Sequence, residues 1–449
     1  MNRKSLGVIS LAFMALAILL PGSTMAGSRD GRHALRPVIF VHGGSGSGAQ
    51  FESQSQRFAS NGYPADYIAV SEYDSTYSTN TREDVWAGID RAIADMLAKT
   101  GADKVDILGH SLGTVVLYGY LNSSPERAAK VAHYVSIDGM PGITPPGGVP
   151  TLALWAGTGT AGREITGAIN VTIPDQTHVQ CATSPESFFE MYRFFAGRRP
   201  STTRITPERP DLVKLAGRAV LFPQNVGVQN ATLEIWEVDG RTGKRLASKP
   251  RAVYSLSGDG SWGPFNANGD RHYEFAIVRW RDGLEIGPTH HFYFEPFERS
   301  DYLIRLNTND PGTGLDMLVD VSERQTDLII TRYKELWGDQ PGQDDKLEIA
   351  GTNVVSAATC PIDKRVNAIF AFDVGADGVS DVSRPIPVFF ALPFLTGVDL
   401  FVPSATPPDS TVSIVLTPRG GGGKTEVLNV PNWASLTDRV SLQFHDYLQ

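Results

Sequence analysis

Short apolar runs alternate with segments of helical periodicity along the first 200 residues. The apolar runs have the length of buried strands, and glycine or proline bounds several of them. Between two of them, residues 86–97 place apolar side chains at the spacing of one helix face, directly after a capping sequence at residues 81–84. Strands that alternate with helices imply a parallel sheet with helices on both faces. We predict strands at residues 37–41, 66–71, 105–108, 131–137, 151–156 and 168–173, and a further helix at residues 184–195.

The pattern changes after a linker at residues 197–203. Short runs of alternating apolar and polar residues follow, separated by turn signals such as the Asn-Gly-Asp at residues 268–270. This pattern predicts a β-sandwich over residues 201–303 and a second β-rich domain over residues 304–449, with one helix near residues 322–337.

The third apolar run ends in Gly-His-Ser-Leu-Gly, and an apolar helical segment follows at once. Gly109 and Gly113 allow the backbones of strand and helix to cross closely, which leaves Ser111 at the tip of a sharp turn. The amide of Leu112 then lies at a helix N-terminus, where it can stabilise a developing oxyanion. An ordinary loop serine is the alternative. The strand before Ser111 and the helix after it favour a nucleophile.

A glycine-rich loop, His-Gly-Gly-Ser-Gly-Ser-Gly at residues 42–48, follows the first predicted strand. One interpretation is the phosphate loop of a dinucleotide enzyme, with Glu72 as the acid that binds the ribose. That interpretation leaves the serine turn unexplained. The other is an oxyanion loop, in which a backbone N–H, that of Gly44, faces Ser111.

Residues 109–113, together with Phe-Val-His-Gly-Gly at residues 40–44, resemble the α/β-hydrolase superfamily. The order of the motifs and the β-rich tail are similar to those of secreted bacterial and archaeal lipases with a C-terminal lipid-binding domain. The resemblance covers residues 36–200. It implies an α/β-hydrolase fold (a parallel sheet covered by helices) for a catalytic domain at residues 27–200, followed by β-rich C-terminal domains.

A serine hydroxyl at neutral pH needs a base within hydrogen-bond reach, and histidine is suited to that role. Of the nine histidines, His178 follows the last predicted strand of the hydrolase unit, where the superfamily places its base. For the acid, Asp138 at the end of a predicted strand keeps the order Ser, Asp, His, and the resembling lipases use that strand. Asp175 and Glu164 are weaker candidates, because neither lies at a strand end.

The first 26 residues have the composition of a secretory signal. Arg3 and Lys4 precede an uncharged, mostly apolar run at residues 6–20, and small residues near Ala26 suit a cleavage site. The apolar run is shorter than the roughly 20 residues that span a bilayer. We therefore expect a secreted, extracellular protein.

Charge and cysteine content narrow the partners. The net charge of −9 argues against a nucleic acid or an anionic membrane as a binding partner.

Cys181 and Cys360 either form a disulfide between the two halves of the chain or remain as buried thiols. The aspartates of residues 373–381 fit a solvated turn better than a calcium loop. We expect no metal and no cofactor.

These features predict a secreted serine ester hydrolase, a lipase or carboxylesterase with a Ser-Asp-His triad, that cleaves acylglycerols or similar apolar esters through an acyl-enzyme. Ser111 is the expected nucleophile, His178 the base, Asp138 the acid, and Gly44 and Leu112 the oxyanion donors. A polyester depolymerase has the same features. A catalytically inactive extracellular binding module on a hydrolase fold is the third interpretation.

The segment at residues 139–150 contains too many prolines and glycines to form a helical lid. We therefore expect an open catalytic unit, with lipid binding delegated to the C-terminal region as a separable module. The apolar stretch at residues 388–395 fits a buried strand better than a lipid-facing patch. Truncation after Arg199 is expected to preserve the hydrolysis of soluble esters.

Overall fold

A computed structural model of the chain describes residues 35–448, so the predicted signal segment, residues 1–26, lies outside the described residues. The first part of the described chain contains a six-stranded sheet in the order β2-β1-β3-β4-β5-β6. Every neighbouring pair in it is parallel. The strands are β1 (Val38–Val41), β2 (Ile68–Ser71), β3 (Val105–His110), β4 (Val131–Ile137), β5 (Thr151–Ala156) and β6 (Ile169–Ile173).

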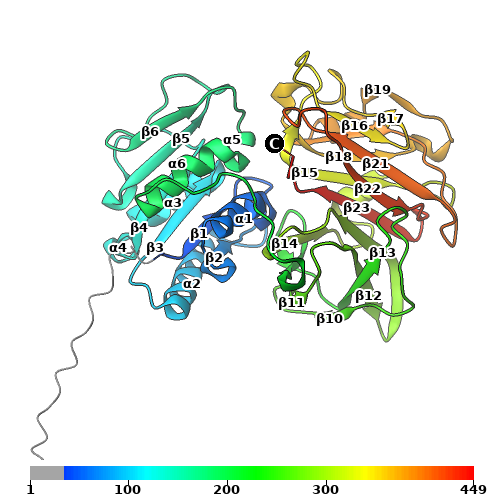
Figure 1. Cartoon of the computed structure of the whole chain (residues 1–449), viewed down its shortest axis with the longest axis horizontal. Helices are drawn as coiled ribbons and strands as arrows, with labels where there is room; N and C mark the ends of the chain where they lie inside the picture. The colour runs from blue at the N-terminus through cyan, green and yellow to red at the C-terminus, as the bar shows by residue number, and fades with distance from the viewer. Residues whose placement is uncertain (1–34, 449) are drawn as a thin grey trace, which may run out of the picture. The chain divides into compact units, whose positions relative to one another are not determined.

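Helices cover both faces of this sheet (Figure 1). Val38 and Phe40 pack with apolar residues of α1 and α6, whereas Ile39 and Val41 pack with α2 and α3. Successive residues of a strand point to opposite faces, so the two clusters lie on opposite sides of the sheet. The expected α/β fold is confirmed. Within residues 35–448, no helix is long and apolar enough to cross a membrane. The helices are α1 (Glu52–Ser60), α2 (Arg82–Thr100), α3 (Leu112–Ser123), α4 (Pro125–Ala129), α5 (Gln180–Thr183) and α6 (Pro185–Ala196).

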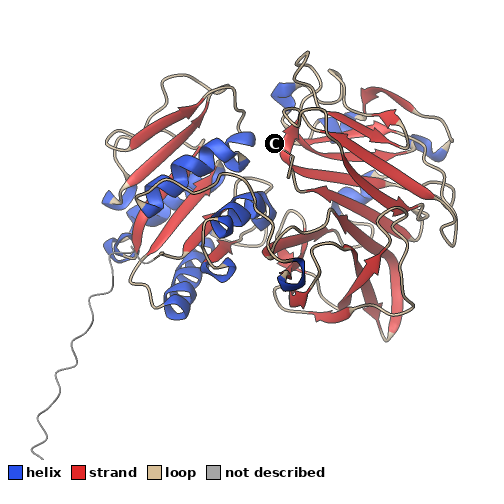
Figure 2. Cartoon of the chain, in the orientation of Figure 1, coloured by secondary structure: helices blue, strands red, loops and turns tan. Residues whose placement is uncertain are grey.

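After α6, strands dominate the chain (Figure 2). A nine-stranded sheet has the order β10-β9-β12-β13-β23-β15-β18-β20-β19, and two smaller sheets have the orders β11-β7-β14, with β8 beside β7, and β17-β16-β21-β22. The expected β-rich C-terminal region is confirmed. Its strands are β7 (Lys214–Leu221), β8 (Val226–Gly227), β9 (Ala231–Val238), β10 (Ala252–Leu256), β11 (Ser261–Asn266), β12 (His272–Arg281), β13 (Leu284–Phe294), β14 (Asp301–Thr308), β15 (Leu328–Leu336), β16 (Lys346–Ile349), β17 (Thr352–Asn353), β18 (Val366–Phe372), β19 (Asp381–Pro385), β20 (Leu395–Asp399), β21 (Thr411–Thr417), β22 (Glu426–Pro431) and β23 (Asp438–Phe444).

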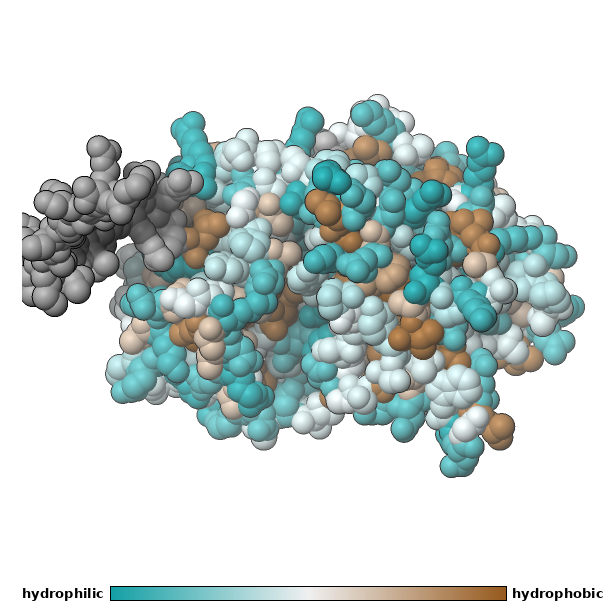
Figure 3. Space-filling view, turned by 60° about the horizontal axis from the view of Figure 1, so that its bottom comes forward, coloured by the Kyte–Doolittle hydropathy of each residue, from teal (hydrophilic) through white to brown (hydrophobic). Residues whose placement is uncertain are grey.

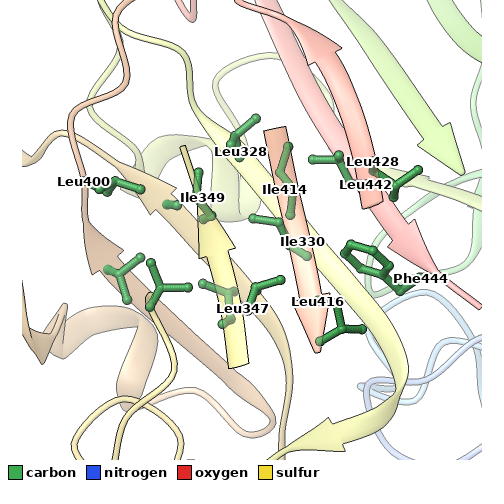
Figure 4. Close-up of a cluster of buried hydrophobic side chains, with 14 of the residues drawn as sticks. Leu328, Ile330, Leu347, Ile349, Leu400, Ile414, Leu416, Leu428, Leu442 and Phe444 are labelled. Carbon is green, nitrogen blue, oxygen red and sulfur yellow. The ribbon is translucent and has the colours of Figure 1, made fainter. Parts of the chain in front are cut away.

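Two hydrophobic cores lie against the nine-stranded sheet. The first joins β9, β12 and β13 to the sheet of β7, β11 and β14, and includes Phe275 and Ile304. The second joins β15, β18 and β23 to β16, β21 and β22, and includes Ile330, Ile414 and Leu442 (Figure 4). Each core is the interior of a two-layer β-sandwich.

The last strand, β23, joins the two sandwiches. It pairs in parallel with β13 on one side and with β15 on the other. The β-rich segments at residues 201–303 and 304–449 therefore share one sheet. A domain boundary between residues 303 and 304 stays a prediction.

Two local predictions are wrong. The helix expected near residues 322–337 is the strand β15, whose residues Leu328 and Ile330 point into the second core. Both faces of β15 are covered, so its sequence lacks the clean alternation of a half-exposed strand. The strand expected at residues 388–395 is the one-turn helix α7 (Pro387–Phe390) followed by a loop. Pro387, at the start of α7, and Pro393, in the loop, lack the N–H that a strand pairing needs.

Cys181 and Cys360 are free thiols, and both are buried. Cys181 packs in a core of the parallel sheet, whereas Cys360 packs in the second β core. Of the two alternatives for these cysteines, the structure has buried thiols.

Candidate active site

Ser111 lies between β3 and α3 in a conformation that a non-glycine residue adopts at a cost, with φ 52° and ψ −120°. The surrounding glycines make the turn sterically feasible. A Cβ at Gly113 would lie 2.3 Å from the carbonyl oxygen of Val41, and one at Gly109 would lie 2.8 Å from the backbone of Gly113. The tight strand-to-helix turn expected from the sequence is therefore present, with Ser111 at its tip.

Asp138 and His178 meet although 40 residues separate them in the sequence. Nδ1 of His178 lies 2.6 Å from Oδ2 of Asp138. The other carboxylate oxygen, Oδ1, accepts hydrogen bonds from the amide of Ala156 at 2.8 Å and from Nη2 of Arg163 at 2.6 Å. Burial alone would raise the pKa of Asp138, but the hydrogen bonds from His178 and Ala156 and the neighbouring cations lower it to about 2. Asp138 is therefore an anion that fixes His178 with Nδ1 as the donor.

In the described part of the chain, neither of the two weaker acid candidates forms a hydrogen bond with the imidazole of His178, whose Nδ1 is paired with Asp138. Asp175 is exposed in the loop between β6 and α5. Glu164 is also exposed, and its carboxylate accepts a hydrogen bond from the hydroxyl of Thr166. The strand-end position of Asp138 places its carboxylate at the sheet edge beside His178, which neither alternative position does.

The glycine loop passes close to the serine. A Cβ at Gly43 would lie 3.1 Å from Cβ of Ser111. The N–H of Gly43 donates to Oε1 of Gln50 at 3.2 Å, and the N–H of Ser45 donates to Oγ of Ser75 at 2.8 Å. Gly44 lies between these two anchored residues and lines the same cavity as Ser111. The assignment of Gly44 and Leu112 as oxyanion donors stays a prediction.

A cavity of about 400 Å³ contains Ser111 and His178 in its wall. Within residues 35–448, no hydrogen bond joins the Ser111 hydroxyl to His178. Much of the remaining wall comes from the β-rich region, including Ile329, Phe370 and Leu395. The expectation of an open catalytic unit is therefore wrong, because the β-rich tail closes part of the cavity. On the molecular face in Figure 3, apolar residues form separate small patches among polar ones.

Family models match three parts of the chain. The model described as lipase (class 2) matches residues 35–120, which include the glycine loop and Ser111. The model described as lipase C-terminal domain matches residues 211–311, and a third model, of a C-terminal domain, matches residues 314–448. The chain is a lipase-like α/β-hydrolase with a C-terminal β domain.

Solved structures similar to this lipase-like hydrolase include lipases and esterases. Lipase B from Aspergillus fumigatus matches with 14% identity and a TM-score of 0.31, over 38% of this chain and 55% of that one. The carboxylesterase CesB from Bacillus subtilis matches with 15% identity and a TM-score of 0.28, over 37% and 85%. A gene product from Listeria innocua matches with 14% identity and a TM-score of 0.30, over 38% and 97%.

The lipase-like hydrolase also contains a link between its glycine loop and the loop of His178 that the sequence analysis missed. Nε2 of His110 lies 2.8 Å from the carbonyl oxygen of His178, and Nδ1 of His110 contacts the side-chain amide of Gln50. Burial, together with the neighbouring His178, lowers the pKa of His110 to about 3. His110 is therefore neutral and donates through Nε2 to the His178 loop. Since Gln50 also holds Gly43, His110 connects the glycine loop to the loop of His178.

Arg163 is a second residue that the sequence analysis missed. Its charge leads to a prediction about the pH dependence of kcat/KM. Its guanidinium lies 2.6 Å from Oδ1 of Asp138, whose Oδ2 lies 2.6 Å from Nδ1 of His178, so its loss would remove a positive charge close to the imidazole. Replacing Arg163 by methionine should move the acid limb of the pH dependence of kcat/KM upward by about one pH unit. Arg163→Lys keeps the charge and serves as the matched control. If the pH dependence of kcat/KM is the same in Arg163→Met as in the wild type, the arginine has no electrostatic influence on His178.

Glu72 anchors the β-rich region to the glycine loop. Its carboxylate accepts a hydrogen bond from the amide of Gly48 at 2.7 Å, pairs with Nε of Arg305 at 2.6 Å and pairs with Arg218. Burial would raise the pKa of Glu72, but the two arginines lower it to about 2. Its oxygens are thus engaged by the protein itself, in place of the ribose contact considered in the dinucleotide interpretation.

We expect Glu72→Gln to lower the free energy of unfolding at pH 7 by about 3 kcal/mol, because two arginines lose their buried counter-ion. The folded pKa is depressed, so the ionised carboxylate stabilises the protein above its unfolded pKa near 4.5. The free energies of unfolding of the wild type and of Glu72→Gln should therefore become more similar as the pH falls from 5 towards 2. Urea unfolding of both proteins at several pH values in this range measures the two free energies. Asp211→Asn, which breaks an exposed pair with Arg209, should change little at any pH.

Proposed function

We propose that this lipase-like hydrolase is a secreted serine ester hydrolase that cleaves acylglycerols or similar apolar esters through an acyl-enzyme. One observation carries the proposal: His178, which is hydrogen-bonded to Asp138, lines the same cavity as the serine of a nucleophile elbow. An oriented imidazole beside such a serine is the arrangement that acyl transfer requires.

In the proposed reaction, His178 takes the proton of the Ser111 hydroxyl as its oxygen attacks the ester carbonyl. Asp138 holds Nδ1–H of the imidazole and stabilises the imidazolium that forms. The N–H groups of Gly44 and Leu112 stabilise the oxyanion. Substrate binding brings the hydroxyl and the imidazole into hydrogen-bond contact, as is common in hydrolases whose free form has looser geometry.

The tetrahedral intermediate then collapses, and His178 returns the proton to the leaving alcohol. A water molecule, deprotonated by His178, attacks the acyl-enzyme and releases the carboxylic acid. Ser111 is regenerated, so each turnover consumes one water and one ester.

The cavity wall supports an apolar substrate. Ile329, Phe370 and Leu395 line it on the side of the β-rich region, and Leu315 and Val319 continue the apolar surface. Apolar side chains that an acyl chain contacts are partly dehydrated on binding, which favours apolar esters over polar ones. An aliphatic polyester segment has the same chemistry, so depolymerisation is the alternative substrate class.

A substrate screen tests the proposal. Purified protein should hydrolyse p-nitrophenyl esters and an emulsified triglyceride, and comparison with a soluble polyester oligomer decides between the two substrate classes. Absence of hydrolysis of every ester by a folded protein would favour the inactive binding module.

Secretion is proposed from residues 1–26 alone. Expression of the full chain in a secreting host should yield protein in the medium whose N-terminus begins at Gly27. Full-length protein that retains Met1 and stays inside the cells would contradict the proposed signal.

A further inference from the structure

A side chain from the β-rich region holds the loop that carries His178. Glu335 lies on β15, 157 residues after His178, and is fully buried. Its Oε1 accepts a hydrogen bond from the amide of Val179 at 2.9 Å, and its Oε2 accepts one from the hydroxyl of Thr177. One carboxylate thus binds the residue before and the residue after His178.

His110, at the end of β3, also holds this loop. The carbonyl oxygen of His178 accepts the hydrogen bond from His110 described above. The loop is therefore held at three consecutive residues, through the hydroxyl of Thr177, the carbonyl oxygen of His178 and the amide of Val179, and two of these contacts come from Glu335. Hydrogen bonds to a carboxylate are about twice as strong as those between neutral groups, which suits Glu335 to this task.

Glu335 itself lies on a rigid element. β15 pairs with β18 and with β23 inside the nine-stranded sheet. The carbonyl oxygen of Glu335 accepts a hydrogen bond from Arg419, whose Nη2 reaches Oε1 of Gln180 at 3.3 Å, one residue after Val179. A catalytic group supported from a packed sheet keeps its geometry more closely than one supported by its own loop.

We propose that Glu335 is a positioning residue for the base His178, so that the C-terminal β region completes the catalytic centre. This inference rests on the proposed function, in which His178 takes the proton of Ser111. Without the carboxylate, the amide of Val179 and the hydroxyl of Thr177 lose their buried acceptor, and the loop shifts to find new partners. A displacement of about 1 Å at a catalytic group can cost about 10² in rate.

With Glu335 as a positioning residue, the C-terminal region acts on the catalytic centre itself. As a separable lipid-binding module, this region would affect only emulsified substrates. As the source of Glu335, it affects every substrate, soluble esters included. The soluble ester therefore separates the two roles.

The test compares Glu335→Ala and Glu335→Gln on a soluble p-nitrophenyl ester. We expect Glu335→Ala to lower kcat by about 10², with KM changed by less than about threefold, because the base is displaced while the cavity remains. Glu335→Gln should restore kcat to within about fivefold of wild type, since its amide oxygen still accepts from Val179 and its NH2 donates to the Thr177 hydroxyl. The rate of phosphonylation of Ser111 by a fluorophosphonate should follow kcat.

Asp301→Asn is the matched control. Asp301 is another buried carboxylate of the β-rich region that contacts the hydrolase, but its partner is Gln56 of α1, at 2.8 Å. This variant should keep wild-type kcat on the soluble ester. If Glu335→Ala behaves like Asp301→Asn, or if Glu335→Ala raises only KM, the inference is wrong.

Thr177→Val keeps the test decisive if Glu335→Ala does not fold. This nearly isosteric change removes only the hydroxyl donor, and kcat should fall by about three- to tenfold. In the double variant with Glu335→Gln, the losses should not be multiplicative, because both changes alter the same contact between residues 177 and 335. An unchanged kcat in Thr177→Val overturns the inference.

The proposed function is overturned by different results, namely a wild-type protein that hydrolyses no ester or a Ser111→Ala variant that retains full activity.

Discussion

Replacing Ser111 by alanine should lower kcat for ester hydrolysis by about 10⁶, as removal of the nucleophile does in a comparable triad. The variant keeps the cavity and the oxyanion donors, so only the weak catalysis that binding and electrostatics provide should remain. His178→Ala should lose about as much, since the serine and its base act as one unit. Initial rates with a soluble p-nitrophenyl ester measure both variants.

Ser123→Ala is the control for the serine variant. Ser123 ends α3, the helix that begins directly after Ser111. Its hydroxyl donates to the carbonyl of Tyr120 at 2.6 Å and accepts from Nη1 of Arg127 at 2.9 Å, so its contacts are local to the far end of the helix. Its loss should leave kcat near the wild-type value. If purified, folded Ser111→Ala keeps more than a few per cent of the activity, the serine-hydrolase proposal fails.

Asp138→Asn should lower kcat by about 10⁴ while the fold persists. The amide oxygen of the new asparagine is drawn to the side occupied by Oδ1, where the N–H of Ala156 and Nη2 of Arg163 both donate. Its NH2 then faces Nδ1 of His178. The imidazole must accept there and carry its proton on Nε2, so it cannot take the proton of the serine.

The two alternative acids provide matched controls for this prediction. Asp175→Asn and Glu164→Gln remove exposed carboxylates and should change kcat less than about threefold, because surface substitutions rarely affect a distant site. A crippling effect of Asp175→Asn, with an active Asp138→Asn, would show that the acid assignment is wrong.

Local patterns predicted the parts of the site that lie on consecutive residues. The strand, the two glycines and the helix around Ser111 are specified within one short segment, so the turn followed from the sequence. Asp138 followed from its position at a strand end. The fold brings Asp138 and His178 into contact, and their catalytic roles stay predictions.

The residues that support the loops had no local signal. Glu72 meets Arg305 across 233 residues, and Glu335 meets Val179 across 156. Glu72 directly follows β2 and Glu335 lies on β15, and a charged residue ordinarily indicates an exposed site. Only the packing of the β-rich region against the hydrolase buries them, and pairing across that boundary compensates for the burial.

The linker at residues 197–203 illustrates the same limit. Its composition predicted a linker, yet the side chain of Asn61 accepts from the amide of Ser201 at 2.7 Å and donates to the carbonyl of Thr202 at 2.8 Å. Nε of Arg57 donates to the carbonyl of Thr203 at 2.9 Å. A polar segment held by backbone hydrogen bonds has the same composition as a free one.

Mass spectrometry of the protein after reaction with a fluorophosphonate tests the central claim most directly, because the reagent phosphonylates only a serine that a base has activated. We expect one phosphonyl group per chain, on the peptide that contains Ser111, and none on Ser111→Ala. Folded wild-type protein that gains no phosphonyl group, or gains it elsewhere with Ser111 unmodified, would show that Ser111 is not the nucleophile.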